Sequence, residues 1–155
     1  RLVAAYGTQI ETDIPGLTHL FPSAGALAAI DPTELPMPRA RGRALTGLAS
    51  ALAAGEVSLD RGADRDDVRA ALVALPGIGP WTADYVAMRA LGHPDVFLPT
   101  DIGVRNALAG LGHDPTSVVA DSDRWRPWRS YALMHLWNTL MPSLSTTQPL
   151  TSKED

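Results

Sequence analysis

Apolar residues recur at intervals of three and four along most of the chain, which is the spacing of one face of an α-helix. The stretch that starts at Asp64 shows this period clearly, with apolar residues at Val68, Ala71, Leu72 and Leu75. Proline and glycine interrupt the pattern often, and no stretch alternates apolar and polar residues long enough to predict a strand. The pattern predicts an all-α domain without internal repeats.

Capping residues and helix breakers set the expected bounds of these helices. Ser or Asp before an apolar run can accept hydrogen bonds from the first backbone N–H groups, and glycine or proline ends the run. The expected helices, caps included, cover residues 23–30, 40–54, 64–75, 80–91, 100–108 and 127–141. Thr100 is the expected N-cap of the helix that contains Asp101, and residues 95–99 form an extended link before it. Residues 142–155, rich in Ser, Thr and Pro, are expected to be a disordered tail after a domain of residues 1–141.

Composition is typical of one soluble globular domain. The chain has 155 residues, 45% of them apolar, which is enough for one domain with a core and too short for two of average size. No apolar run approaches the roughly 20 residues needed to cross a bilayer, so we expect no membrane partner. The chain contains no cysteine, which excludes disulfides, thiolate nucleophiles and iron–sulfur clusters and is compatible with the cytoplasm.

Charge gives a mixed indication of the partner. The formal net charge of −4 argues mildly against nucleic acid, because DNA-binding domains often carry a basic excess. The positive charge is nearly all arginine, however, and it is concentrated in two groups: Arg39, Arg41 and Arg43, and Arg124, Arg126 and Arg129. A local basic face can exist on an acidic protein, so the net charge does not exclude DNA.

The most informative segment is Leu-Pro-Gly-Ile-Gly-Pro at residues 75–80. Gly77 and Gly79 between two helices allow a turn that exposes backbone N–H groups at a helix N-terminus, where a phosphate is favoured. Ile78 between them would turn back and pack the two helices together. Glycines at this spacing also suit a tight turn that binds nothing, and the spacing alone favours that simpler interpretation.

The longer string resembles the helix-hairpin-helix motif, which binds the DNA backbone without reading the base sequence. The resemblance implies phosphate contacts from Gly77, Ile78, Gly79 and Thr82. It also suggests a monovalent cation, Na⁺ or K⁺, at the hairpin carbonyls of Leu75 and Ile78. Contacts of this kind position a protein on DNA and need few basic side chains, which weakens the objection from net charge.

Three further motifs resemble the helix-hairpin-helix DNA glycosylase superfamily and, within it, DNA-3-methyladenine glycosylase II. They are Trp-Thr-Ala-Asp-Tyr at residues 81–85, Asp-Val-Phe-Leu-Pro-Thr-Asp at residues 95–101 and Trp-Arg-Pro-Trp-Arg-Ser-Tyr-Ala at residues 125–132. The similarity covers roughly residues 1–141. It implies the fold of this superfamily, an orthogonal helical bundle. It also implies that the protein removes alkylated purines of the 3-methyladenine and 7-methylguanine type from double-stranded DNA in base excision repair, by hydrolysis of the N-glycosidic bond.

The resemblance gives Asp101 the catalytic role. A carboxylate at a helix N-terminus is favoured in its ionised form. Its fixed charge can stabilise an oxocarbenium-like transition state or orient water toward C1′ of the sugar. Without the resemblance, the simpler interpretation of Asp101 is an aspartate that only caps its helix. Asp95, the other carboxylate of the motif, is expected to cap or pair near the link and to have a structural role.

The resemblance also places Trp81, Tyr85 and Trp128 in the walls of a base pocket. Aromatic residues at helical spacing more often belong to a core, and the others nearby are expected there: Trp125, Tyr131 and Trp137. An electron-rich ring face attracts the positive charge that alkylation at N3 or N7 gives a purine. The enzyme reaches C1′ by flipping the nucleotide out of the duplex.

Bifunctional members of the superfamily carry a lysine at the second position after the last hairpin glycine, where it attacks C1′. Trp81 occupies that position here, and Lys153 falls in the expected tail. We therefore expect a monofunctional enzyme without AP-lyase activity. The histidines lack the spacing of metal ligands and are expected at the surface or as caps, so we expect no catalytic metal and no organic cofactor.

The resemblance covers only part of the family's catalytic domain, which begins one or two helices earlier with a segment that wedges into DNA. We expect a fragment or one piece of a fusion, monomeric, paired with or fused to that segment, and associated with the nucleoid in a bacterial cytoplasm. One alternative is a non-catalytic helix-hairpin-helix DNA-binding module or an inactive glycosylase fragment. Another is a glycosylase for oxidised or mismatched bases, which the tryptophan-rich pocket disfavours.

Overall fold

The computed structural model describes residues 1–60, 62–114 and 117–141, and helices dominate it. The helices are α1 (Leu2–Tyr6), α2 (Ala24–Ala28), α3 (Arg39–Ala53), α4 (Arg65–Ala74), α5 (Pro80–Ala90), α6 (Ile102–Gly110), α7 (Val118–Ser122), the 3-10 helix η1 (Asp123–Trp125) and α8 (Arg129–Thr139). Two short strands, β1 (Thr8–Gln9) and β2 (His19–Leu20), pair antiparallel. The predicted helical fold class is confirmed. The strands are its one correction, because two residues are too few to show alternation.

All six helices predicted from periodicity are present in the structure. Ser23 and Asp64 accept hydrogen bonds from free backbone N–H groups at the starts of α2 and α4, as predicted. The predicted cap of α6 is wrong: Asp101, not Thr100, is its N-cap, and the carboxylate accepts a hydrogen bond from the Val104 amide. The sequence pattern does not predict α7 and η1, because helices this short show little periodicity.

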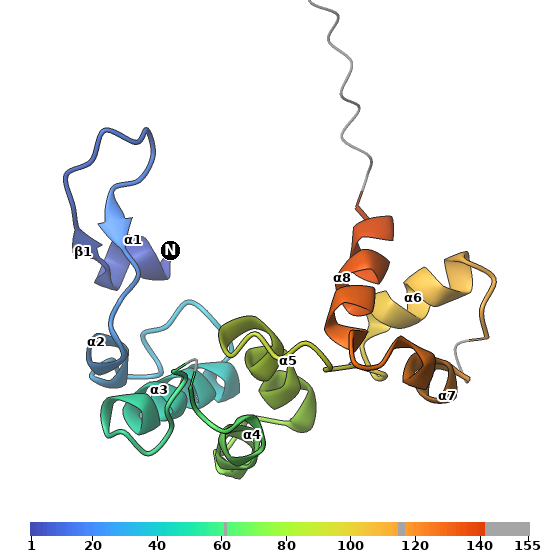
Figure 1. Ribbon diagram of the computed structural model, residues 1–155. Helices are drawn as coiled ribbons and strands as arrows, with labels where there is room; N and C mark the ends of the chain where they lie inside the picture. Colours follow the sequence, from blue (N-terminus) through green and yellow to red (C-terminus); the bar gives the residue numbers. More distant parts are fainter. Residues whose placement is uncertain (61, 115–116, 142–155) are drawn as a thin grey trace, which may run out of the picture.

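Figure 1 shows the larger helices in two groups joined by an extended link between α5 and α6. One group contains α3, α4 and α5, and the other contains α6, α7 and α8. The link is apolar on its inner side, and its residues Val96, Phe97 and Leu98 are buried in the main core. That core also includes Leu72 of α4 and Leu133 of α8, which are fully buried. Both groups therefore share one core, and the link between them is fixed.

Two further predictions concern the C-terminal tail and the absence of a membrane-spanning segment. The expected tail of residues 142–155 lies outside the part of the chain that the structure describes. Within the described residues, none of the helices has both the length and the apolar character that a membrane crossing needs.

Candidate active site and nucleic-acid interface

The hairpin between α4 and α5 is held against α3 by a glycine. Gly77 has φ +86°, in the left-handed region, and a Cβ added to it would lie 2.8 Å from the Ala44 side chain. Ile78 is 8% exposed and packs in the main core, as predicted. Gly79 differs, because its φ of −86° suits any residue and an added Cβ would meet nothing within 4 Å. The fold requires glycine at position 77 but not at position 79.

Free backbone N–H groups gather at the tip of this hairpin and in the first turn of α5. No acceptor among the described residues takes the amide hydrogens of Gly77, Gly79, Trp81 or Thr82. The Ile78 amide is different, because it donates to the Leu75 carbonyl at 3.1 Å. The free donors lie at the positive end of the α5 dipole, where an anion is stabilised.

The hairpin carbonyls of Leu75 and Ile78 keep lone pairs that no backbone hydrogen bond within the described part of the chain uses. The Ile78 carbonyl accepts no backbone hydrogen bond from the described residues, and the Leu75 carbonyl accepts one, which leaves it a second lone pair. Carbonyl oxygens are ligands that hard cations accept. Elsewhere in residues 1–60, 62–114 and 117–141, no group of three or more His, Asp or Glu residues could hold a metal ion.

The two glycines allow a matched test of the hairpin. Gly77→Ala is expected to lower the free energy of unfolding by roughly 2–3 kcal/mol, because it combines a left-handed backbone with a clash against Ala44. Gly79→Ala should change that energy by less than about 0.5 kcal/mol. It should nevertheless weaken DNA binding about tenfold or more, because its methyl group occupies the space a phosphate must approach and a charge-assisted hydrogen bond contributes about 1.5–3 kcal/mol.

Urea unfolding and fluorescence-anisotropy titration of a DNA duplex measure these two effects. Equal DNA affinity for Gly79→Ala and the unaltered protein would contradict close approach of a phosphate to the hairpin.

Three N–H donors from separate parts of the chain hold the Asp101 carboxylate. The Val104 amide and the Trp137 indole nitrogen lie 2.9 and 3.0 Å from Oδ1. The Trp81 indole nitrogen lies 3.2 Å from Oδ2. The capping interpretation of Asp101 is thus correct for one of these bonds. Two indole donors go beyond what a helix cap needs, and they fix the orientation of a half-buried carboxylate that can only accept.

Three aromatic rings form a continuous series beside this carboxylate. Trp81 and Tyr85 stack with centroids 5.3 Å apart and planes at 9°. Tyr85 and Trp137 follow at 6.0 Å and 53°. Trp81 and Tyr85 are in direct contact, so a base cannot enter between them. Trp81 is 39% exposed, and its open surface is the part of the series that a flat ligand can reach.

Trp137 and Trp128 lie in other places than the sequence suggests. Trp137, expected only in the core, packs against it and also donates to Asp101. Trp128 is the N-cap of α8, nine residues earlier and therefore roughly 13 Å away along the helix axis. It is 58% exposed and meets Tyr131 edge-on at 5.7 Å. Tyr131 is itself 59% exposed, so its predicted place in the core is wrong. The structure brings Trp81 and Tyr85 to Asp101 but leaves Trp128 outside this group.

A signal for Trp137 was available in the sequence. Ser130, Leu133 and Trp137 recur at helical spacing, so they mark one face of α8. The helix α8 packs against α6, which Asp101 caps, and Trp137 on this face reaches the Asp101 carboxylate.

Gly103 is a further position that the sequence does not single out. A Cβ added there would lie 3.1 Å from Asp101 Oδ1 and 3.3 Å from Leu140 Cδ1, both tighter than ordinary van der Waals contact. Glycine at position 103 therefore lets the Asp101 carboxylate lie close to the backbone of α6 without a shift.

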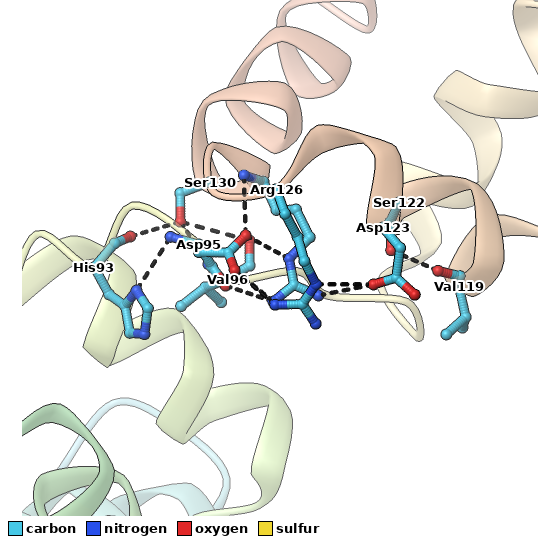
Figure 2. Close-up of polar contacts among 9 residues, drawn as sticks. His93, Asp95, Val96, Val119, Ser122, Asp123, Arg126 and Ser130 are labelled. Atoms are coloured by element: carbon cyan, nitrogen blue, oxygen red, sulfur yellow. Dashed lines mark hydrogen bonds and ion pairs between the residues drawn. The ribbon is translucent and has the colours of Figure 1, made fainter.

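An ion-pair network holds the link that leads to Asp101 (Figure 2). The Asp95 carboxylate accepts hydrogen bonds from Arg129 Nε at 2.6 Å and from Arg126 Nη1 at 2.7 Å. Arg129 Nη2 also donates to the Asp95 backbone carbonyl at 2.8 Å. Burial raises the pKa of the Asp95 carboxyl. The hydrogen bonds and charge of Arg129, together with the charge of Arg126, lower this pKa by more than burial raises it, so it lies below its usual value. The structural role predicted for Asp95 is confirmed.

Neutral hydrogen bonds join the same link to the start of α8, also visible in Figure 2. Ser130 Oγ donates to the His93 carbonyl at 2.6 Å and accepts from the Val96 amide at 2.9 Å. The Asp95 amide lies 3.1 Å from His93 Nδ1. Burial, reinforced by nearby arginine charge, lowers the pKa of His93, so its ring is neutral near pH 7 and Nδ1 can accept. His93 caps the link, in agreement with the role expected of the histidines.

The fold and the site together define a class of protein. The chain superposes on the 3-methyladenine DNA glycosylase of Archaeoglobus fulgidus with a TM-score of 0.73, covering 88% of this chain and 49% of that one at 24% identity. It superposes on Schizosaccharomyces pombe 3-methyladenine DNA glycosylase Mag1, solved with abasic DNA, with a TM-score of 0.70, covering 79% and 65% at 21% identity. The chain therefore has the helix-hairpin-helix DNA glycosylase fold, as predicted.

Sequence comparison gives closer relatives. The chain is 49% identical over 142 residues to the "Probable bifunctional transcriptional activator/DNA repair enzyme AlkA" of Mycobacterium tuberculosis. It is 38% identical over 142 residues to DNA-3-methyladenine glycosylase 2 of Escherichia coli K12. These alignments include 90% of this chain but 29% and 49% of the two relatives. No family model matches. The chain is homologous to DNA-3-methyladenine glycosylases and spans half or less of the length of these two.

Proposed function

We propose that this chain provides the catalytic carboxylate, the base-stacking surface and the DNA backbone contacts of a glycosylase that excises alkylated purines in base excision repair. One observation carries the proposal. Asp101 is fixed by two indole N–H groups and its own helix, directly beside the stacked rings of Trp81 and Tyr85. A negative charge next to an aromatic surface suits a cationic base attached to a sugar.

This geometry supports the following reaction. The exposed surface of Trp81 receives a flipped purine whose positive charge is attracted to electron-rich rings. The bond between C1′ and the purine nitrogen breaks, its electron pair leaves with the base, and the alkylated purine departs neutral. Asp101 stabilises the positive charge that develops on the sugar. Water then forms a bond to C1′ and loses a proton to the solvent, which leaves an abasic site.

The hairpin provides the contacts with the DNA backbone. The free amides of Gly77, Gly79 and Thr82 bind phosphate oxygens. DNA as the partner agrees with the similarity of this chain to proteins that are named as DNA repair enzymes. A monovalent cation, Na⁺ or K⁺, at the carbonyls of Leu75 and Ile78 would add positive charge next to such a phosphate. We propose a monomer that acts on one duplex in the cytoplasm.

We further propose that the enzyme is monofunctional. Trp81 occupies the position of the lysine used by bifunctional relatives, and its indole nitrogen is directed at Asp101. Lys153 lies outside the described residues, so the structure does not place it. Since Lys153 is the single lysine of the sequence, the described residues contain no lysine side chain that could form a Schiff base.

A duplex with one 7-methylguanine or 3-methyladenine tests the function. We expect the protein to release the free base, to leave the abasic strand uncut until alkali is added, and to form no covalent complex with borohydride. Covalent trapping would contradict the monofunctional claim. Binding of DNA without release of any alkylated, oxidised or mismatched base would instead support the non-catalytic binding module.

A further inference from the structure

Unpaired positive charge is concentrated at the start of α3. The side chains of Arg39, Arg41 and Arg43 are exposed, and none forms an ion pair or side-chain hydrogen bond with the described residues. The second arginine group is neutralised, because each member pairs with an aspartate: Arg124 with Asp121, Arg126 with Asp95 and Asp123, and Arg129 with Asp95. The two groups have similar spacing in the sequence, but only the first can attract an external anion.

The location of these arginines is unfavourable for the helix itself. Arg39 and Arg41 lie in the first turn of α3, where the helix dipole disfavours cations, and this turn contains no acidic residue. The N-cap is Pro38, which offers no capping side chain. Cations at a helix N-terminus, without a nearby acidic residue or a capping side chain, cost stability, and such a cost is typical of a functional surface.

Arg41 and Arg43 lie on either side of the contact between α3 and the hairpin. Ala40 and Ala44 form the stripe of α3 that faces Gly77. Since successive residues turn by about 100° around a helix, Arg41 and Arg43 project to opposite sides of that stripe.

The grooves beside the hairpin agree with this arrangement. Arg41 lines a groove of about 690 Å³ together with Gly77, Trp81 and Thr82. Arg43 lines another of about 360 Å³ on the Pro76 side of Gly77. Each groove therefore combines one unpaired guanidinium with the hairpin backbone.

We propose that Arg41 and Arg43 bind phosphates of the DNA backbone on either side of the phosphate held by the hairpin. This inference rests on the proposed function, because it extends the contact with the same DNA strand. A planar guanidinium matches two phosphate oxygens, and free amides of the hairpin tip lie beside Arg41 in its groove. Arg39 precedes Arg43 by one helical turn and adds charge on its side. The contacts read no base, so they strengthen binding to any sequence.

The salt dependence of DNA binding tests this proposal. The 155-residue chain is titrated against a duplex with a tetrahydrofuran abasic site at several KCl concentrations. Each phosphate contact contributes about 0.9 to the slope of log K against log[salt]. Arg41→Gln and Arg43→Gln are each expected to reduce this slope by about 0.9, with the same loss on an undamaged duplex. Arg124→Gln is the matched control, since it removes the same charge from an arginine already paired, and it should leave the slope unchanged.

Four outcomes are distinguishable. Reduced slopes for Arg41→Gln and Arg43→Gln alone support the proposal, whether or not the protein releases bases. Unchanged slopes for both variants overturn it and leave the proposed function standing if base release is intact. An equal reduction for Arg124→Gln also overturns it, because net charge would then explain the effect. Absence of DNA binding by the unaltered chain overturns both the contact and the proposed function.

Discussion

Replacement of Asp101 by asparagine is expected to slow base release by about 10²–10⁴-fold while DNA binding is retained. The substitution keeps the size of the side chain and one oxygen for the cap of α6. It removes the negative charge that stabilises the sugar cation. With the oxygen retained at the position of Oδ1, the NH₂ group takes the place of Oδ2, so the Trp81 indole N–H faces another donor. The loss of the negative charge and the loss of the fixed orientation of the side chain both slow base release.

A matched control separates chemistry from helix capping. Asp64 is the N-cap of α4 and accepts hydrogen bonds from two backbone amides, in the same way that Asp101 caps α6. Asp64→Asn should leave base release unchanged, because this carboxylate has no indole partner among the described residues. The two variants are compared by single-turnover release of base and by equilibrium binding to an abasic duplex. A similar loss of activity in both would show that Asp101 acts only as a cap.

Asp95→Ala is expected to lower the free energy of unfolding by about 3–5 kcal/mol, the largest effect on stability. The substitution removes the nearer carboxylate partner of Arg129, whose side chain is 16% exposed, and one partner of Arg126. The other carboxylate near Arg129, that of Asp123, lies 3.8 Å away. An arginine that is mostly buried recovers few of the lost hydrogen bonds from water. The link that carries Asp101 would also lose its attachment to α8, so base release should fall as well.

Asp123→Ala is the control for this prediction, because it breaks pairs with the same two arginines, Arg126 at 3.0 Å and Arg129 at 3.8 Å, at a site where the aspartate is 62% exposed. Exposed pairs contribute at most about 1 kcal/mol. Urea unfolding should therefore separate the two variants clearly. If Asp95→Ala were no less stable than Asp123→Ala, the network would not hold the link.

The stability from Asp95 should also depend on pH in a defined direction. Its pKa in the folded protein lies below its value in the unfolded chain, which is about 3.9. The stabilisation is therefore fully present above about pH 4–5 and is lost as the pH falls through the lowered pKa. Below pH 4, the free energy of unfolding should decrease less steeply in Asp95→Asn than in the unaltered protein. Parallel decreases would contradict the network as the cause.

The helical fold could be predicted from local signals. The 3.6-residue period of α4 and the caps Ser23 and Asp64 depend only on neighbouring residues, and the structure agrees with them. The burial of Ile78 between the hairpin glycines follows from the same local logic. The β1–β2 pair could not be predicted, since its residues are too few to show a pattern.

The site required knowledge of which elements meet in space. Asp101 and Trp81 were identified through motifs near the hairpin, but Trp137 is brought to Asp101 only by the packing of α8 against α6. The arginines show this limit in part. Arg124 and Arg126 have local partners three residues earlier, Asp121 and Asp123, so this pairing could be predicted from the sequence. The pairs that Arg126 and Arg129 form with Asp95 depend on the position of the link in the fold, which sequence spacing does not reveal.

The most direct test of the central claim is single-turnover release of 3-methyladenine, with protein in excess over a duplex carrying one lesion. The proposed role of Asp101 predicts time-dependent release of free base by the protein and release by Asp101→Asn no faster than about one hundredth of that rate. Equal rates for the two proteins, or no release by the unaltered protein while it binds the duplex, would contradict it.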